Sequence, residues 1–347
     1  MTKPDIKILS IDGGGIRGVI PCRILAFIES QIGMPLSDVF DLIAGTSTGG
    51  IISLGLASEN PATQAPFSAE EMLELYKENG DTIFGTRKSN FWTRLASVTP
   101  LKDLVQYTLE SKGIESVLLK YFGERRLKNS LTDVFITSHD LESNRPFYFS
   151  SRIAKQKTEE NYLVREAARA TSAAPTYFEP VLVDYKKDND LALIDGGVLA
   201  NNPAVLAYSE AKEIFKQKNK NKKVFDPEVA PDDSDLPFYM LSLGTGHVRR
   251  SISGEKAKEW GTLNWIKPLV SDIFMQSVAA STHYTIQHLL PPYTDGTKRY
   301  DRIAFEIPEN LSDMDEPKNI VALIAIADEY IKQNKKELLT ICDILTN

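Results

Sequence analysis

A serine flanked by glycines stands between a short apolar segment and a run of small residues. Residues 42–44 are apolar and short enough for a buried strand, and they lead into Gly45-Thr46-Ser47-Thr48-Gly49. Small and apolar residues follow to position 57, as in a buried helix. This order matches the nucleophile elbow, a sharp turn that lifts a serine hydroxyl clear of a sheet. It predicts an α/β fold with Ser47 as a nucleophile. A plain flexible turn is the alternative.

A second glycine-rich segment follows the first predicted strand, residues 6–11, and precedes a predicted helix over residues 19–31. Within it, Gly13, Gly15 and Gly18 fit the G-x-G-x-x-G pattern of dinucleotide-binding folds. That pattern also needs an acidic residue at the end of the next strand, and here the next strand leads to Ser47. We favour an oxyanion loop, in which backbone N–H groups without side chains face the substrate. A purely structural glycine turn is the alternative.

A third segment places an aspartate after a predicted hairpin. Residues 178–183 and 191–194 resemble two strands joined by a polar loop. Asp195-Gly196-Gly197 directly follows the second of these strands. Asn202 and Pro203 then begin a helix that is predicted to reach residue 215. An aspartate at a strand end beside two glycines suits a catalytic base, although a simple turn residue would look similar.

The alternation of strands and helices predicts a mostly parallel sheet with helices on both faces. Ligands bind such sheets beyond the carboxyl ends of the strands, and each of the three segments directly follows a strand. We therefore expect them to meet at one edge. The other predicted strands cover residues 133–138, 145–149, 239–243 and 302–307, and the other predicted helices cover residues 68–76, 101–110, 116–122, 160–171, 258–289 and 318–344.

Three regions carry open alternatives. Residues 83–92 mix turn signals with large aromatic residues, which suits local packing or a lipid-contact loop. Residues 216–235 change from basic to acidic, which suits a solvated connection or, less well, a basic patch facing a membrane. The apolar residues of the predicted helix over 258–289 are expected to pack in the protein core. The alternative is that they form a wall along which lipid reaches the site.

Composition excludes several classes of protein. The chain has 347 residues, 42% of them hydrophobic and 25% charged, which is ordinary for a globular protein. Its net charge of −7 argues against a nucleic-acid binder, which needs a basic face. No apolar signal core or spanning run is visible, and the two cysteines are expected to be free thiols, so we expect a cytoplasmic protein. No cluster of Cys and His indicates a metal site.

The three segments, in this order, resemble those of the patatin-like phospholipases. Residues 12–18, Gly45-Thr46-Ser47-Thr48-Gly49 and Asp195-Gly196-Gly197 carry the resemblance, which covers about residues 6–210. Ala200-Asn201-Asn202-Pro203 and Ser242-Leu243-Gly244-Thr245-Gly246 are also similar to family segments. We find no departure from the family pattern at the motif positions. Beyond about residue 250, family features cannot be matched residue by residue.

The resemblance implies a three-layer α/β fold and a Ser–Asp dyad, with Ser47 as nucleophile and Asp195 as base. It also implies an oxyanion hole formed by Gly13, Gly14 and Gly15, and it requires no cofactor and no metal. Arg17 would brace the glycine loop or pair with an acid or a phosphate. The expected supporting residues are Arg17, Gly18, Gly45, Gly49, Gly196 and Gly197.

The resulting hypothesis is a lipid acyl hydrolase that releases fatty acids from glycerophospholipids while acting peripherally on membranes. We expect one domain over residues 1–347, with a motif-bearing core at about 6–210 and residues 236–347 packed on it. The alternative resembles bacterial patatin-like effectors of antiphage defence, which a cyclic nucleotide activates. Oligomeric state, acyl position and headgroup preference do not follow from the sequence.

Overall fold

The computed structural model describes residues 4–85, 109–184, 190–219, 236–249, 253–261 and 275–346, and a mixed sheet lies at its centre. The strand order is β5-β6-β3-β2-β1-β7-β8, and β4 pairs with β3. The strands are β1 (Ile6–Ile11), β2 (Leu42–Gly45), β3 (Asp133–Asp140), β4 (Arg145–Ser150), β5 (Val181–Asp184), β6 (Asp190–Asp195), β7 (Phe238–Leu243) and β8 (Tyr300–Ile303).

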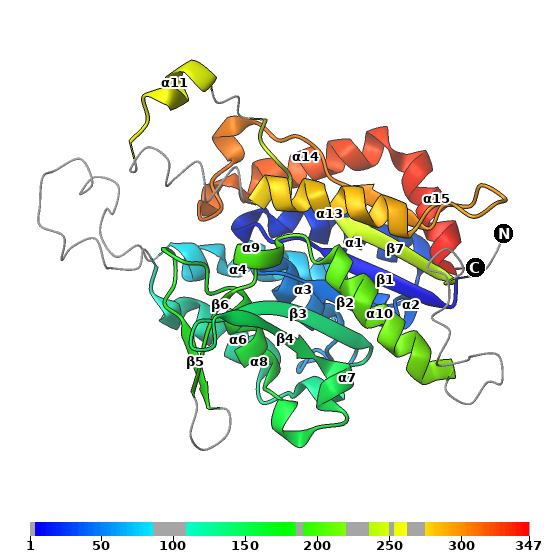
Figure 1. Cartoon of the computed structure of the whole chain (residues 1–347), viewed down its shortest axis with the longest axis horizontal. Helices are drawn as coiled ribbons and strands as arrows, with labels where there is room; N and C mark the ends of the chain where they lie inside the picture. Colours follow the sequence, from blue (N-terminus) through cyan, green and yellow to red (C-terminus); the bar gives the residue numbers. More distant parts are fainter. Residues whose placement is uncertain are drawn as a thin grey trace, which may run out of the picture.

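Helices cover both faces of this sheet, as Figure 1 shows. Alternate residues of β1 enter two separate cores, because successive strand side chains point to opposite faces. Leu9 and Ile11 pack with α1, α3 and α14, whereas Ile6 and Ile8 pack with α10 and α13. The helices are α1 (Val19–Ile32), α2 (Leu36–Val39), α3 (Thr48–Leu56), α4 (Ala69–Phe84), α6 (Ser111–Phe122), α7 (Ser151–Ala154), α8 (Val164–Thr171), α9 (Gly197–Ala200), α10 (Ala204–Asn219), α11 (Gly254–Lys258), α13 (Met275–Leu289), α14 (Ile320–Gln333) and α15 (Lys335–Thr346). The three-layer α/β fold is confirmed.

The parallel strands end level with one another. Ile11 of β1 is opposite Gly45 of β2 on one side and Leu243 of β7 on the other. Leu243 is in turn opposite Ile303 of β8. The glycine loop that begins at Asp12 and the elbow after Gly45 therefore leave the sheet at the same edge.

The strand that carries Asp195 reaches this edge in an unexpected direction. β3 continues past Ile136, which is level with Gly45, as far as Asp140. β6 pairs antiparallel with this extension, so that Asp195 is opposite Ser138. The three segments meet as predicted, but β6 runs antiparallel to β3 and therefore reaches the edge from the opposite direction.

Several element boundaries differ from the prediction. The helix expected from residue 160 begins at Val164, where the side chain of Glu166 accepts a hydrogen bond from the Leu163 N–H group and caps the first turn. The strand expected from residue 178 begins at Val181, because Phe178 is buried against the Arg169 guanidinium instead. The strand expected over 302–307 is Tyr300–Ile303. Most of the predicted helix over 101–110 and the middle of that over 258–289 lie outside the described residues.

Candidate active site

Ser47 has the backbone of a strained elbow. Its φ of 56° and ψ of −124° place this residue in a backbone region that residues other than glycine seldom occupy. A Cβ atom at Gly45 would lie 2.2 Å from the carbonyl oxygen of Gly49, and one at Gly49 would lie 2.2 Å from that of Ile11. Only glycine fits at either position, so the pattern in the sequence follows from the close approach of two chain segments.

Asp195 is the acidic partner of this serine. Its side chain is buried, and the Ser47 hydroxyl donates toward the carboxylate. The backbone N–H of Gly197 donates a second hydrogen bond to Oδ1 at 2.7 Å, which orients the carboxylate. The structure thus places together the two residues that the sequence predicted as a dyad.

The pKa of Asp195 is raised to about 7. Burial is the largest cause, because a charged carboxylate loses its hydration in the protein interior. Hydrogen bonds from Ser47 and Gly197 oppose the rise by stabilising the charged form. A carboxyl group with a pKa near neutral is suited to accept and return a proton at neutral pH.

The glycine loop presents two N–H groups beside the serine. Among the residues that the structure describes, the N–H groups of Gly14 and Gly15 have no hydrogen-bond partner. Gly13 differs from the expectation, because its N–H donates to the carbonyl oxygen of Asn201 at 3.0 Å. A group that is already paired cannot also bind an oxyanion, so Gly13 supports the loop rather than serving as a donor.

Two segments outside the loop hold it in place. The Thr245 hydroxyl donates to the carbonyl oxygen of Gly13 at 2.8 Å. The Asn201 side chain donates to the same oxygen at 3.4 Å, in addition to the backbone contact with Gly13. Asn201 and Thr245 belong to the two further segments that resembled the family, and their contacts with the loop explain that resemblance physically.

An apolar cavity of about 380 Å³ opens over the dyad. Ser47, Asp195, Gly14 and Gly15 form its polar floor. Apolar and aromatic side chains from α3, α4, α6 and the segment before β5 form its walls: Ile51, Tyr76, Ile83, Phe84, Ile114 and Phe178. An acyl chain would exclude water here and so strengthen the electrostatic interactions at the floor. Ile83 and Phe84 come from the expected aromatic region, whose residues from 86 onward lie outside the described part.

Thr171 is a positioning residue that the sequence did not indicate. Its hydroxyl, at the end of α8, accepts a hydrogen bond of 2.8 Å from the Ser47 N–H and thereby holds the elbow. Thr171→Val keeps the shape and leaves this N–H unpaired, which costs about 1–3 kcal/mol. We expect kcat to fall roughly 10- to 100-fold, as measured by fatty-acid release.

Thr132→Val is the matched control for this change. The Thr132 hydroxyl is buried and donates to the Phe40 carbonyl oxygen at 2.6 Å, away from the dyad. We expect the control to lose stability but keep its kcat. Equal kcat losses in the two variants would assign the effect of Thr171 to general destabilisation.

Comparison with known proteins decides the family. The sequence model described as Patatin-like phospholipase matches residues 9–208, more than half of the chain. The chain belongs to the patatin-like phospholipase family. Membership supports lipid acyl hydrolase activity in broad terms.

Relatives of this patatin-like chain include proteins of rice and potato. It is 31% identical over 345 residues to Patatin-like protein 2 of rice (Oryza sativa subsp. indica), covering 95% of this chain and 84% of the rice protein. It is 30% identical over 353 residues to the potato (Solanum tuberosum) protein named Probable inactive patatin-3-Kuras 1, covering 96% and 88%. The crystal structure of VipD from Legionella pneumophila matches with a TM-score of 0.36 and 10% identity, over 93% of this chain and 67% of that one.

The part of this patatin-like protein beyond residue 208 also reaches the site. Arg302 of β8 forms a bidentate ion pair with Asp12, the residue before the glycine loop, and its Nη1 lies 2.8 Å from Oδ1. The Asp12 side chain is buried, the Arg302 side chain is 10% exposed, and Arg302 also donates to the Ser242 hydroxyl at 2.8 Å. This pair fixes the start of the glycine loop, after β1, to β8, which lies two strands away in the sheet. No pattern in the sequence indicates this ion pair.

The remaining predicted residues lie around the loop and the elbow. Gly18 lies against the Thr48 side chain, and Gly196 lies against Thr137. Arg17 is half-buried, and its Nε lies 3.4 Å from the Gly14 carbonyl oxygen, which fits a bracing role. In the described ranges there is no cluster of Cys, His, Asp and Glu suited to a metal, and none of the helices there is long and apolar enough to cross a membrane.

Proposed function

We propose that this chain is a serine acyl hydrolase in which Ser47 and Asp195 act as a dyad on the fatty acyl esters of glycerophospholipids. One observation carries the proposal. The hydroxyl of the strained Ser47 elbow donates toward a buried carboxylate in an apolar cavity. Gly14 and Gly15 also line this cavity, and their N–H groups have no hydrogen-bond partner within the described part of the chain. Nucleophile, base, oxyanion donors and a site for an acyl chain are thus provided together.

Acylation would begin with attack of Ser47 Oγ on the ester carbonyl carbon while Asp195 takes the hydroxyl proton. Negative charge develops on the carbonyl oxygen, where the N–H groups of Gly14 and Gly15 would stabilise it. Asp195 then returns the proton to the leaving alcohol. In the second half, Asp195 takes a proton from water while the water oxygen attacks the acyl carbon. The bond between that carbon and Ser47 Oγ then breaks, Asp195 returns the proton to Oγ, and the fatty acid leaves.

The pKa of Asp195 sets the expected pH dependence. Because a base must be ionised to accept the serine proton, activity should be present above pH 7 and lost as the pH falls through about 7. The measurement is kcat/KM for a soluble acyl ester between pH 5 and 9, since this parameter reports groups of the free enzyme. A profile that is flat across pH 7 would contradict the assignment of Asp195 as base.

The lipid substrate is tested with the purified protein and vesicles of mixed phospholipids. We expect fatty acids to appear without any additive, and Ser58→Ala to behave like wild type. Ser58 is a suitable control because it lies just beyond α3, away from the dyad. Its buried hydroxyl donates to the carbonyl oxygen of Leu54 within that helix. Silence until a cyclic nucleotide is added would instead support the effector alternative and contradict constitutive hydrolysis.

A further inference from the structure

The acid of the dyad lies just before a very short helix. α9 has four residues, Gly197–Ala200, and the N–H of its first residue donates to the Asp195 carboxylate at 2.7 Å. A helix of one turn is not stable by itself, because nucleation is costly. Among these four residues, all of which the structure describes, only Ala200 is buried. Contacts with the rest of the protein therefore have to fix α9, and with it Asp195.

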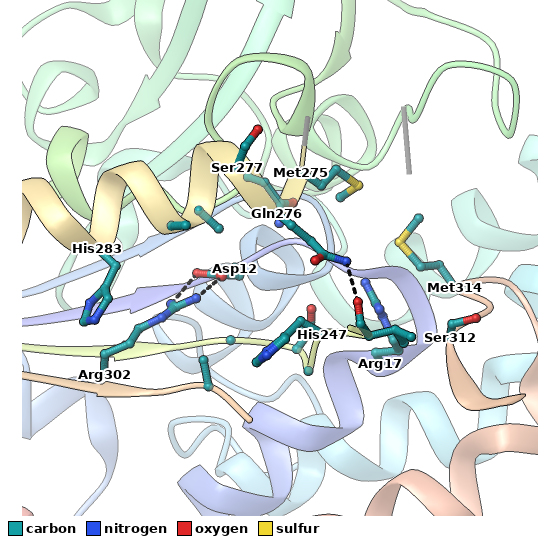
Figure 2. A pocket seen from close by; sticks show the side chains of 18 of the residues that line it. Asp12, Arg17, His247, Met275, Gln276, Ser277, His283, Arg302, Ser312 and Met314 are labelled. Carbon is teal, nitrogen blue, oxygen red and sulfur yellow. Dashed lines mark hydrogen bonds and ion pairs between the residues drawn. The ribbon is translucent and has the colours of Figure 1, made fainter. Parts of the chain in front are cut away.

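Cavities adjoin α9 and reduce the packing available to it. Gly197 and Val198 line the apolar catalytic cavity, and Val198 is 52% exposed. Asn201, the residue after α9, lines a second cavity of about 640 Å³. Figure 2 shows this second cavity between the first half of α13 and the ends of β7 and β8. Atoms that face a cavity have no packing partner on that side, so α9 depends on its contacts with the elbow and with β3.

Thr46, the residue before the nucleophile, provides the contact with the elbow. Its hydroxyl donates to the carbonyl oxygen of Ala200 at 2.7 Å. This carbonyl is at the end of α9, where carbonyl groups have no partner within the helix. The Thr46 hydroxyl also lies 2.7 Å from Oγ1 of Thr137 on β3. Because a hydroxyl has one proton, and Thr46 directs its proton to Ala200, Thr137 is the donor in this second contact.

Thr137 extends these contacts to the residue that follows Asp195. A Cβ atom at Gly196 would lie 2.1 Å from Thr137 Oγ1, so the Gly196 backbone packs directly on this hydroxyl. Thr46 and Thr137 are both fully buried. Hydrogen bonds are electrostatically stronger in such surroundings than in water. The two hydroxyls thus contact both ends of the turn that follows Asp195.

We propose that Thr46 and Thr137 position the dyad: they hold α9 against the elbow, so that Asp195 stays within hydrogen-bond reach of Ser47 Oγ. The inference rests on the proposed acyl hydrolase function and adds two positioning residues to it. Neither threonine belongs to the described lining of either cavity, so both act through Ser47 and Asp195. The pattern G-x-S-x-G leaves the position before the serine open, so it does not by itself indicate a role for Thr46.

The protonation of Asp195 reports on this arrangement. Hydrogen bonds from Ser47 and Gly197 lower its pKa against the effect of burial. The other titratable residues that line its cavity, within the described ranges, are Tyr76, Tyr177 and Asp315. The elements around it carry further titratable or charged groups that have partners of their own: Asp12, Arg17, His139, Asp140, Arg169 and His283. A substitution that loosens α9 should therefore change the Asp195 pKa through the Ser47 hydrogen bond.

The test is Thr46→Val, which removes the hydroxyl and keeps the shape of the side chain. We expect kcat for a soluble acyl ester to fall roughly 10- to 100-fold, because a small displacement of a catalytic group is costly. The midpoint of the pH profile of kcat/KM, about 7 in wild type, should move to higher pH. The reason is that a weaker hydrogen bond from Ser47 lowers the Asp195 pKa less. Thr46→Ser retains the hydroxyl and should restore both values.

Two further variants complete the test. Thr132→Val is the matched control, because it also removes a buried threonine hydroxyl that donates to a carbonyl oxygen, and its kcat and pH midpoint should stay at the wild-type values. Thr137→Val serves if Thr46→Val folds poorly, since it removes a donor without leaving another buried donor unpaired. We expect the same upward shift of the midpoint and a loss of kcat of roughly 2- to 10-fold.

The outcomes separate this inference from the proposed function. A folded Thr46→Val with the wild-type pH midpoint, or with a kcat no lower than that of Thr132→Val, would overturn the positioning role and leave the two threonines as supports of the fold. Hydrolysis by wild type that depends on Ser47 would still support the proposed function in that case. Absence of any Ser47-dependent hydrolysis by wild type would refute the proposed function, and the positioning role with it.

Discussion

Ser47→Ala is expected to lower kcat for fatty-acid release by roughly 10⁴- to 10⁶-fold, the largest effect of any single substitution in this chain. The variant lacks the atom that attacks the ester, and no other hydroxyl can replace it at the elbow. The apolar cavity and the N–H groups of Gly14 and Gly15 are unchanged, so lipid binding should remain. The measurement is release of labelled fatty acid by wild type and variant at equal concentrations.

The result can be interpreted only if the variant is folded. Ser47 has a positive φ, which alanine tolerates no better than serine, so stability should change little. Ser58→Ala and an unchanged melting temperature provide the controls. Equal release by wild type and Ser47→Ala would mean that another residue attacks the ester, and the dyad would be wrong.

Asp195→Asn is expected to lower kcat roughly 10³- to 10⁴-fold, because the amide cannot accept the proton of the Ser47 hydroxyl. The same substitution should raise stability at pH 8. In the folded wild type the pKa of Asp195 is about 7, well above the ordinary aspartate value of 3.8. Folding therefore favours the protonated form, and ionised Asp195 costs on the order of 4 kcal/mol above pH 7.

The sign of this linkage gives a second measurement. Stability contributed by protonated Asp195 is present below about pH 4 and is lost as the pH rises to about 7. Urea unfolding at pH 5 and pH 8 should show Asp195→Asn more stable than wild type by a clearly larger margin at pH 8 than at pH 5. A variant less stable than wild type at pH 8 would indicate that Asp195 is an ordinary ionised carboxylate held by its hydrogen bonds.

Local pattern was sufficient to predict the strand, turn and helix of the elbow. Gly45 and Gly49 have to be glycine because of contacts within a few residues of Ser47 or with the adjacent strand. The meeting of Ser47 with Asp195 was also predictable, because both follow strands. The direction of β6 was not, since an aspartate at a strand end looks the same whether the strand is parallel or antiparallel. The direction of β6 depends on the part of β3 that extends beyond Ile136, the residue opposite Gly45, because β6 pairs with that part.

The supports of the site depend on contacts between distant parts of the chain. Thr171 contacts the Ser47 N–H from 124 positions away, and Arg302 contacts Asp12 from 290 positions away. Neither lies in a recognisable pattern, because a single side chain that accepts or donates one hydrogen bond leaves no periodic trace in the sequence. The same applies to Gly13, whose N–H is directed to Asn201 by tertiary packing.

The most direct test of the Ser–Asp dyad is covalent labelling with a fluorophosphonate, followed by mass spectrometry of the digested protein. This reagent reacts with an activated serine and leaves a phosphonyl group on its Oγ. We predict a single adduct on the peptide that contains Ser47, slow labelling of Asp195→Asn, and none of Ser47→Ala. A protein that releases fatty acids while its adduct lies on a different residue would contradict the assignment of Ser47 as nucleophile.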